Sequence, residues 1–168
     1  DLVYMQALYL EKNIEWHITG NHLFSNAKAL FFAGLYFDSI DSKRWLKLSE
    51  DILIKEISVQ ILNDGGNFEL STMYHSIMLE DILDILNISR AYQYADKKKL
   101  IKDLRNKSTQ MLYCLETMSF SDGKMSLFND SAFNVSQEHK SVTNYAEKLG
   151  IRTFYALIHS QIRSMHPG

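Results

Sequence analysis

The 168-residue sequence has a single cysteine, Cys114, and a single proline, Pro167. One cysteine excludes an internal disulfide framework and a zinc site built from cysteines. The longest apolar runs, such as "ALFFAGLYF", reach about half of the roughly 20 residues that a membrane-spanning helix needs. With proline nearly absent and the glycines mostly between periodic segments, the sequence favours helices joined by tight turns.

An excess of charge of one sign is also lacking. Lys and Arg number 18 against 20 Asp and Glu, which gives a net charge of −2 and an isoelectric point of about 6.3. This balance indicates neither a nucleic acid nor an anionic membrane as a partner. A hydrophobic fraction of 46% with 12% aromatic residues suffices for the core of one domain, or of part of a larger one.

Apolar residues at helical spacing predict six helices, over residues 2–15, 22–37, 43–62, 74–92, 96–118 and 142–149. The second is apolar nearly all round, which is typical of an inner helix, and its small residues Ala27, Ala29, Ala33 and Gly34 allow close neighbours. Asp41 or Ser42 is the predicted N-cap of the third helix.

Three further sequence features lie in the second half of the chain. Gly150 is typical of a helix C-terminus. The lysines at 97–99 indicate a solvated face near the start of the fifth helix, and residues 152–166 fit a strand or a helix equally well.

Two Asp-Gly pairs mark turns between helices. Asp64–Gly65 and Asp122–Gly123 lie 122 − 64 = 58 residues apart, and a short extended apolar stretch follows each. This spacing indicates stacked helical hairpins, each closed by the same kind of turn. The predicted fold class is therefore all-α, built from helical hairpins with short turn-strand elements.

Polar residues lie at the starts of two predicted helices. Asn21 and His22 open the apolar second helix, where Asn21 serves either as an N-cap or as a residue facing a cleft. Glu69, Tyr74 and His75 surround the start of the fourth helix, where Ser71 or Thr72 would act as a cap beside a half-buried tyrosine.

A third polar place is the pair Asn129–Asp130, which fits an Asx turn. All three places fall on connections at one end of a hairpin stack, where loops converge to form clefts. Tyrosine and histidine can hold or donate a proton, and asparagine can donate hydrogen bonds to a carboxylate without titrating. These residue types suit the removal of a proton next to a carboxylate.

The chain resembles the heparinase II/III-like family of polysaccharide lyases. The resemblance rests on the blocks "GNHLFSNAKALFFAGLYF", "WLKLSEDILIKEISVQILNDGGNFELSTMYHSIMLEDILDIL" and "MLYCLETMSFSDGKMSLFNDSAF", which together cover most of residues 15–135. Within them, the Asn-His pair and the later "DGGNFELSTMY" turn are specific in their order and separation.

The resemblance implies that residues 1–168 form part of a single (α/α) toroid catalytic domain, incomplete in circumference. It implies a β-sandwich domain that is absent from this chain, and a structural metal within that domain. No metal or other cofactor is expected in the chain itself.

For function, the resemblance implies cleavage of uronic-acid-containing glycans by β-elimination. Asn21 would neutralise the uronate carboxylate, His22 would assist it or act as the base, and Tyr74 would be the general acid. Glu69, His75 and Asn129 would contact substrate. The expected partner is an acidic polysaccharide or oligosaccharide, met in the periplasm or outside the cell. A uronate epimerase and a non-catalytic module that binds glycan or protein are the alternatives.

Overall fold

The computed structural model describes residues 1–18, 20–94 and 99–152. Within them it contains six α-helices and two isolated antiparallel β-bridges, without a sheet. The helices are α1 (Leu2–Lys12), α2 (Asn21–Tyr36), α3 (Ile40–Gln60), α4 (Thr72–Ala91), α5 (Lys99–Thr117) and α6 (His139–Lys148). The all-α prediction is confirmed. The predictions for residues 97–98 and for 153–166 lie outside the described residues.

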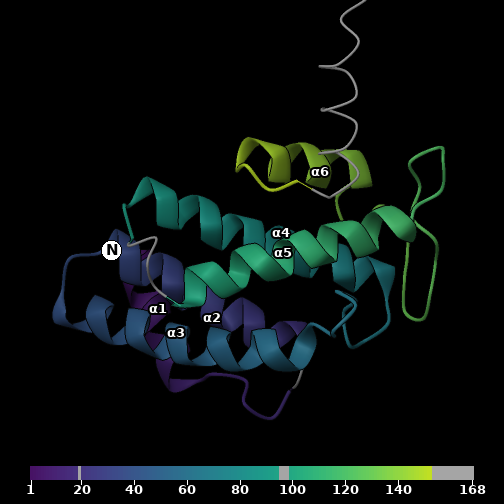
Figure 1. Cartoon of the computed structure of the whole chain (residues 1–168). Coiled ribbons are helices and arrows are strands. Elements are labelled where there is room, and N and C mark those ends of the chain that lie inside the picture. The colour runs from purple at the N-terminus through teal and green to yellow at the C-terminus, as the bar shows by residue number, and fades with distance from the viewer. Residues whose placement is uncertain (19, 95–98, 153–168) are drawn as a thin grey trace, which may run out of the picture.

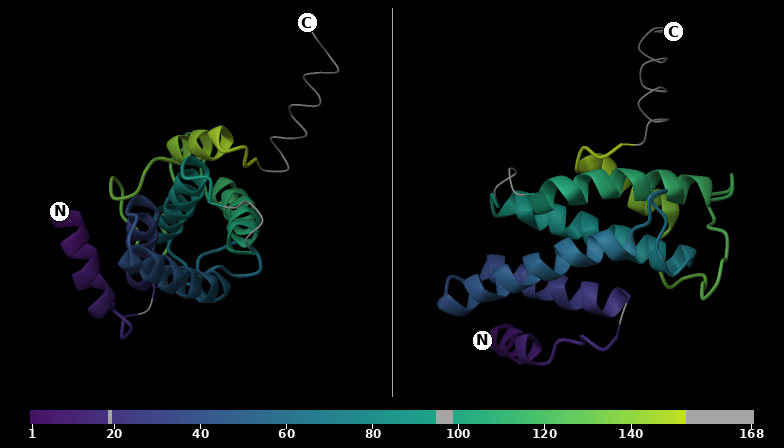
Figure 2. Two further views of the ribbon diagram at one scale, coloured as in Figure 1. Left: turned by 90° about the vertical axis from the view of Figure 1, so that its left-hand side faces the viewer. Right: turned by 60° about the horizontal axis from the view of Figure 1, so that its bottom comes forward.

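Successive helices run antiparallel in an open arc, as expected for part of an α/α toroid. The starts of α2 and α4 and the ends of α3 and α5 all lie at the right-hand end of Figure 1. Helix α1 lies outside the arc against α2 and α3, and α6 packs on α4 and α5 (Figure 2). Because the helices alternate in direction, the polar helix starts predicted from the sequence lie at one end of the molecule.

Local capping accounts for the start of α3 and the end of α6. Helix α3 begins at Ile40, because the Ser39 hydroxyl accepts a hydrogen bond from the Ser42 backbone N–H and Ser42 Oγ accepts one from the Ser39 N–H. This reciprocal pair makes Ser39 the N-cap in place of Asp41 or Ser42. Helix α6 starts three residues earlier than predicted, but it ends as predicted before Gly150, whose φ is +78°.

The two Asp-Gly turns are copies of each other, as their 58-residue spacing predicted. Gly65 and Gly123 adopt φ values of +88° and +84°. The shared backbone bonds run from Leu62 N to Gly66 O and Phe68 N to Gln60 O in the first turn, and from Phe120 N to Lys124 O and Ser126 N to Met118 O in the second. Each turn thus closes a short hairpin at the C-terminal end of one helix, and the chain leads from there toward the next helix.

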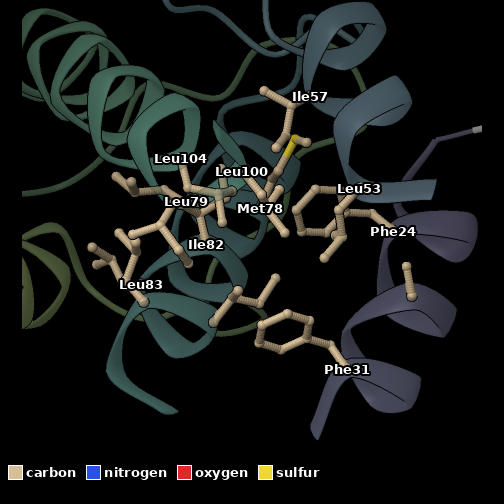
Figure 3. Packing of buried hydrophobic residues seen from close by; sticks show 14 of the residues in the cluster. Phe24, Phe31, Leu53, Ile57, Met78, Leu79, Ile82, Leu83, Leu100 and Leu104 are labelled. Atoms are coloured by element: carbon tan, nitrogen blue, oxygen red, sulfur yellow. The ribbon is translucent and has the colours of Figure 1, made fainter. Parts of the chain in front are cut away.

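The core lies between α2, α3, α4 and α5, and its side chains come from all four helices (Figure 3). Phe24 and Phe31 of α2 are fully buried, as are Leu79 and Ile82 of α4. Close approach of α2 and α3 depends on Gly34, where a Cβ would lie 2.9 Å from the Leu46 backbone nitrogen. The small residues of α2 therefore serve the helix packing for which the sequence pattern suggested them.

One ionic cluster joins α2, α4 and α6. Lys28 Nζ lies 2.6 Å from Asp81 Oδ1 and 2.5 Å from Asp84 Oδ2, and the Tyr145 hydroxyl donates to Asp84 Oδ1 at 2.9 Å. Burial lowers the pKa of Lys28, but its bonds to the two aspartates outweigh burial and raise it. Burial raises the pKa of Asp81 against the effect of Lys28. Lys28 is thus the shared ion-pair partner of two aspartates between packed helices.

Replacing each turn glycine by alanine should lower the free energy of unfolding by a different amount. Gly123→Ala meets no atom within 4 Å and should cost roughly 1–2 kcal/mol, from the positive φ alone. In Gly65→Ala the new Cβ would lie 2.4 Å from the Gln110 carbonyl oxygen, so the helix must also shift, which adds roughly 1–3 kcal/mol. Denaturant unfolding of both variants measures the difference, and equal losses would contradict this packing of the first turn against α5.

Removing Lys28 should make stability depend on pH. In Lys28→Met, the Asp81 carboxylate must be buried without a cation. Burial already raises the pKa of Asp81, so this cost disappears at acidic pH, where Asp81 is protonated. The free energy of unfolding should then fall below that of the parent as pH rises through the aspartate range, by about 2 kcal/mol at pH 7 after discounting partial exposure. A constant difference at all pH values in urea unfolding would show that the loss is one of packing.

Candidate active site

Helix α2 begins without a side-chain cap. Its N-cap is Gly20, with φ +86° and ψ −149°, and Asn21 is the first helical residue. The interpretation of Asn21 as N-cap is therefore wrong. The Asn21 side chain is partly exposed and has no hydrogen-bond partner among the described residues. Its amide is free to bind a ligand.

A buried glutamine holds the backbone at this point. Gln60, the last residue of α3, donates from Nε2 to the Gly20 carbonyl oxygen at 2.8 Å and to Glu56 Oε2 at 2.7 Å. Gln60 is 1% exposed and Glu56 5% exposed. Hydrogen bonds shielded from water in this way fix the carbonyl that opens α2.

Glu69 packs directly against Gly20. A Cβ built on Gly20 would lie 2.8 Å from Glu69 Oε1, so both the positive φ and the space require glycine here. Glu69 Oε1 is buried without a hydrogen-bond partner among the described residues. The structure thus brings Glu69, from the hairpin before α4, beside the Asn-His pair.

His22 is half exposed and lies next to a carboxylate that the sequence did not single out. Its Nδ1 is 3.6 Å from Glu15 Oε2, which also accepts a hydrogen bond from Asn26 Nδ2 at 3.0 Å. The sequence pattern placed Glu15 at the end of a helix over residues 2–15, but α1 ends at Lys12 and Glu15 lies in the irregular segment before α2. Glu15 is thus placed to form an ion pair with a protonated His22 ring.

Tyr74 lies in the first turn of α4, at the same end of the arc as the start of α2 (Figure 1). Ser71 is the N-cap and its Oγ accepts from the Tyr74 backbone N–H at 3.3 Å, which confirms the capping role expected for Ser71 or Thr72. The Tyr74 side chain is partly buried, and its hydroxyl has no hydrogen-bond partner among the described residues. Because α2 packs against α4, Tyr74 and Asn21 project from neighbouring helices.

The loop after the second Asp-Gly turn is tied to this end of α4. Asn129 Nδ2 donates to the Glu69 carbonyl oxygen at 3.0 Å, Ser71 Oγ donates to the Asp130 carbonyl oxygen at 3.0 Å, and Thr72 Oγ1 donates to the Ser126 carbonyl oxygen. The Asn129 amide thus bridges two loops instead of closing an Asx turn. Its contact with Glu69 supports the site, whereas the substrate contact expected for Asn129 stays a prediction.

His75 occupies a different environment from its neighbour Tyr74. Its side chain is 1% exposed, and its Nε2 lies 2.9 Å from the Met111 carbonyl oxygen on α5. Burial lowers the pKa of His75, so the neutral ring donates from Nε2 and leaves Nδ1 without a partner. This placement corrects the expected substrate contact, because a glycan at the surface does not reach a ring buried between two helices.

The arrangement offers proton transfer and hydrogen bonding to an anion. The described residues contain no group of three or more His, Cys, Asp and Glu side chains placed to hold a metal ion. Across the same residues, no helix combines the length and hydrophobicity that crossing a bilayer requires.

Loss of the Gln60 amide should loosen the start of α2. Gln60→Leu leaves the Gly20 carbonyl and the Glu56 carboxylate without their donor, which should cost about 1–3 kcal/mol of unfolding free energy. Hydrogen exchange should accelerate in the first turn of α2 more than in its last turn. Gln6→Leu, on the exposed face of α1, is the control. Unchanged exchange in the first turn would contradict the anchoring role of Gln60.

Comparison with known proteins places the chain in a family. The model of the family described as Heparinase II/III N-terminus matches residues 2–154. Heparin-sulfate lyases from Bacteroides stercoris and Pedobacter heparinus are 30% and 32% identical over 120 and 133 residues, which cover 71% and 76% of this chain. The chain spans 18% and 19% of these relatives, about a fifth of their length.

Solved structures share the helical arc. A heparinase III gene product aligns over 88% of this chain and 23% of its own, with a TM-score of 0.69 and 25% identity. The heparan sulfate lyase of Pedobacter heparinus aligns over 76% and 20%, with a TM-score of 0.60 and 28% identity. The incomplete α/α toroid inferred from the sequence is thus confirmed, and the chain belongs to the heparinase II/III N-terminus family.

Proposed function

We propose that the chain is the N-terminal part of a polysaccharide lyase that cleaves uronic-acid-containing glycans by β-elimination. The observation that carries this proposal is a contrast at one end of the arc. The supporting residues Gln60, Ser71 and Asn129 are all hydrogen-bonded, whereas the Asn21 amide and the Tyr74 hydroxyl are left without protein partners among the described residues. Groups that are held by hydrogen-bonded neighbours yet are unpaired themselves are suited to bind substrate.

The chemistry assigns each group one task. A base removes the C5 proton of the uronate, the electron pair forms the C4–C5 double bond, and the bond from C4 to the glycosidic oxygen breaks. The Asn21 amide donates hydrogen bonds to the uronate carboxylate, which stabilises the negative charge that develops there. The Tyr74 hydroxyl protonates the departing oxygen.

The role of His22 depends on the stereochemistry of the uronate. His22 is the base for one configuration and assists Asn21 for the other. Glu15, 3.6 Å from His22 Nδ1, holds the ring and stabilises the imidazolium formed when the ring takes the proton. For a substrate that requires syn elimination, Tyr74 both removes the C5 proton and donates a proton to the departing oxygen on C4. The lyases named above act on heparin sulfate, and we propose a glycosaminoglycan of that kind, an alternating uronate and hexosamine polymer, as substrate.

The test uses the natural enzyme in its full extent, because this chain spans only a fifth of its relatives. Tyr74→Phe should lower turnover of a uronate polymer about 10²–10⁴-fold, as the loss of a general acid predicts. Asn21→Ala should lower it about 10²–10³-fold. The readout is the absorbance of the new C4–C5 double bond, with Tyr36→Phe at the exposed far end of α2 as the control.

The outcomes separate the alternatives. Turnover in Tyr74→Phe close to that of the parent would contradict the assignment of the acid. Deuterium incorporation from heavy water without chain cleavage would instead show a uronate epimerase. Saccharide binding without turnover, indifferent to Tyr74→Phe, would show a non-catalytic module.

A further inference from the structure

A cavity lies at the start of α6, apart from the residues of the candidate active site. It has a volume of about 570 Å³ and is formed by the second Asp-Gly turn, the loop that follows, and the first turn of α6. Ligand pockets typically measure about 300–1,000 Å³. The roles described above for Asn21, His22 and Tyr74 do not use this cavity.

The charges that line the cavity balance. Asp122 and Lys124 lie on one side, with Asp122 Oδ2 3.4 Å from Lys124 Nζ, and Glu138 and Lys140 lie at the start of α6. The Lys124 backbone N–H holds the pKa of Asp122 below its usual range, so that carboxylate is ionised near neutral pH. Two negative and two positive charges leave no net attraction for a sulfate or carboxylate group.

The remaining lining combines one aromatic face with unpaired hydrogen-bonding groups. The Phe133 ring is 54% exposed, although it borders the cavity. Asn134 has no side-chain partner among the described residues, and His139 Nε2 is a buried nitrogen without one. An exposed aromatic face beside amide and imidazole groups suits the apolar face and the hydroxyl rim of a sugar ring.

We propose that this cavity is a saccharide subsite that binds an uncharged part of a sugar ring, with Phe133 as the stacking surface. The inference takes its ligand class from the proposed function. Thr72 Oγ1 and Ser76 Oγ donate to the carbonyl oxygens of Ser126 and Gln137, which fasten the cavity's loop to the first turns of α4, where Tyr74 lies. We therefore place the subsite on the same glycan as the active site, because these bonds join the loop of the cavity to the helix turn that carries Tyr74.

The chain offers a matched pair of variants for the test. Phe133 and Phe128 lie on the same loop and are 54% and 55% exposed, but only Phe133 lines the cavity. Binding is measured by calorimetry in the natural enzyme carrying Tyr74→Phe, with an unsulfated tetrasaccharide of alternating uronate and N-acetylhexosamine. Phe133→Ala should weaken binding about 3- to 10-fold, and Phe128→Ala should leave it unchanged. The affinity ratio of parent to Phe133→Ala should be the same at low and high salt, because the cavity has no net charge.

Three results of the binding experiment on the variants would overturn the subsite. They are binding by Phe133→Ala equal to that of the parent, an equal loss in Phe128→Ala, and a ratio that collapses at high salt. A parent that binds no saccharide would also overturn it. Turnover with Tyr74 restored tests the proposed function separately. Phe133-dependent binding without turnover would refute the lyase alone, and turnover indifferent to Phe133→Ala would refute the subsite alone.

Discussion

The approach of Glu69 to Gly20 is the constraint on which the rest of the site depends. It brings the hairpin before α4 against the first turn of α2, with 2.8 Å between the Glu69 oxygen and the place a Cβ would occupy. Gln60 fixes the same residue from α3 through the Gly20 carbonyl. With its backbone held from two sides, α2 needs no side-chain cap, and Asn21 and His22 are released from that task. The polar pair that opens the apolar helix α2 is thus not required to cap it.

Repetition explains how the scaffold reaches this end of the molecule. Two turns with the same hydrogen bonds, 58 residues apart, close successive helices and place their loops together. The second loop then bonds to the first, through Asn129 and Ser71. The same turn, used twice, therefore positions both the loops that meet at the start of α4, where Tyr74 lies, and the cavity that Phe133 lines.

Sequence reasoning predicted what local chemistry determines. Apolar spacing identified the helices, and the Asp-Gly pairs identified the turns, because both signals act over a few residues. It missed contacts between distant residues, such as Lys28 with Asp81 and Asp84, 53 and 56 positions away. It also assigned the wrong cap to α3, because Ser39 takes that role and Ser42 is its partner in the first turn. It did not separate His75, which is 1% exposed, from Tyr74, which is only partly buried. The resemblance supplied the candidate roles of Asn21, His22 and Tyr74, which no helix pattern specifies.

The central claim is that the start of α2 and the first turn of α4 face one bound uronate. A crystal structure of the natural enzyme carrying Tyr74→Phe, with a uronate oligosaccharide bound, tests it most directly. The account predicts that the Asn21 amide donates to the uronate carboxylate and that the ring at position 74 lies against the glycosidic oxygen on C4. A uronate bound away from the starts of α2 and α4 would contradict it.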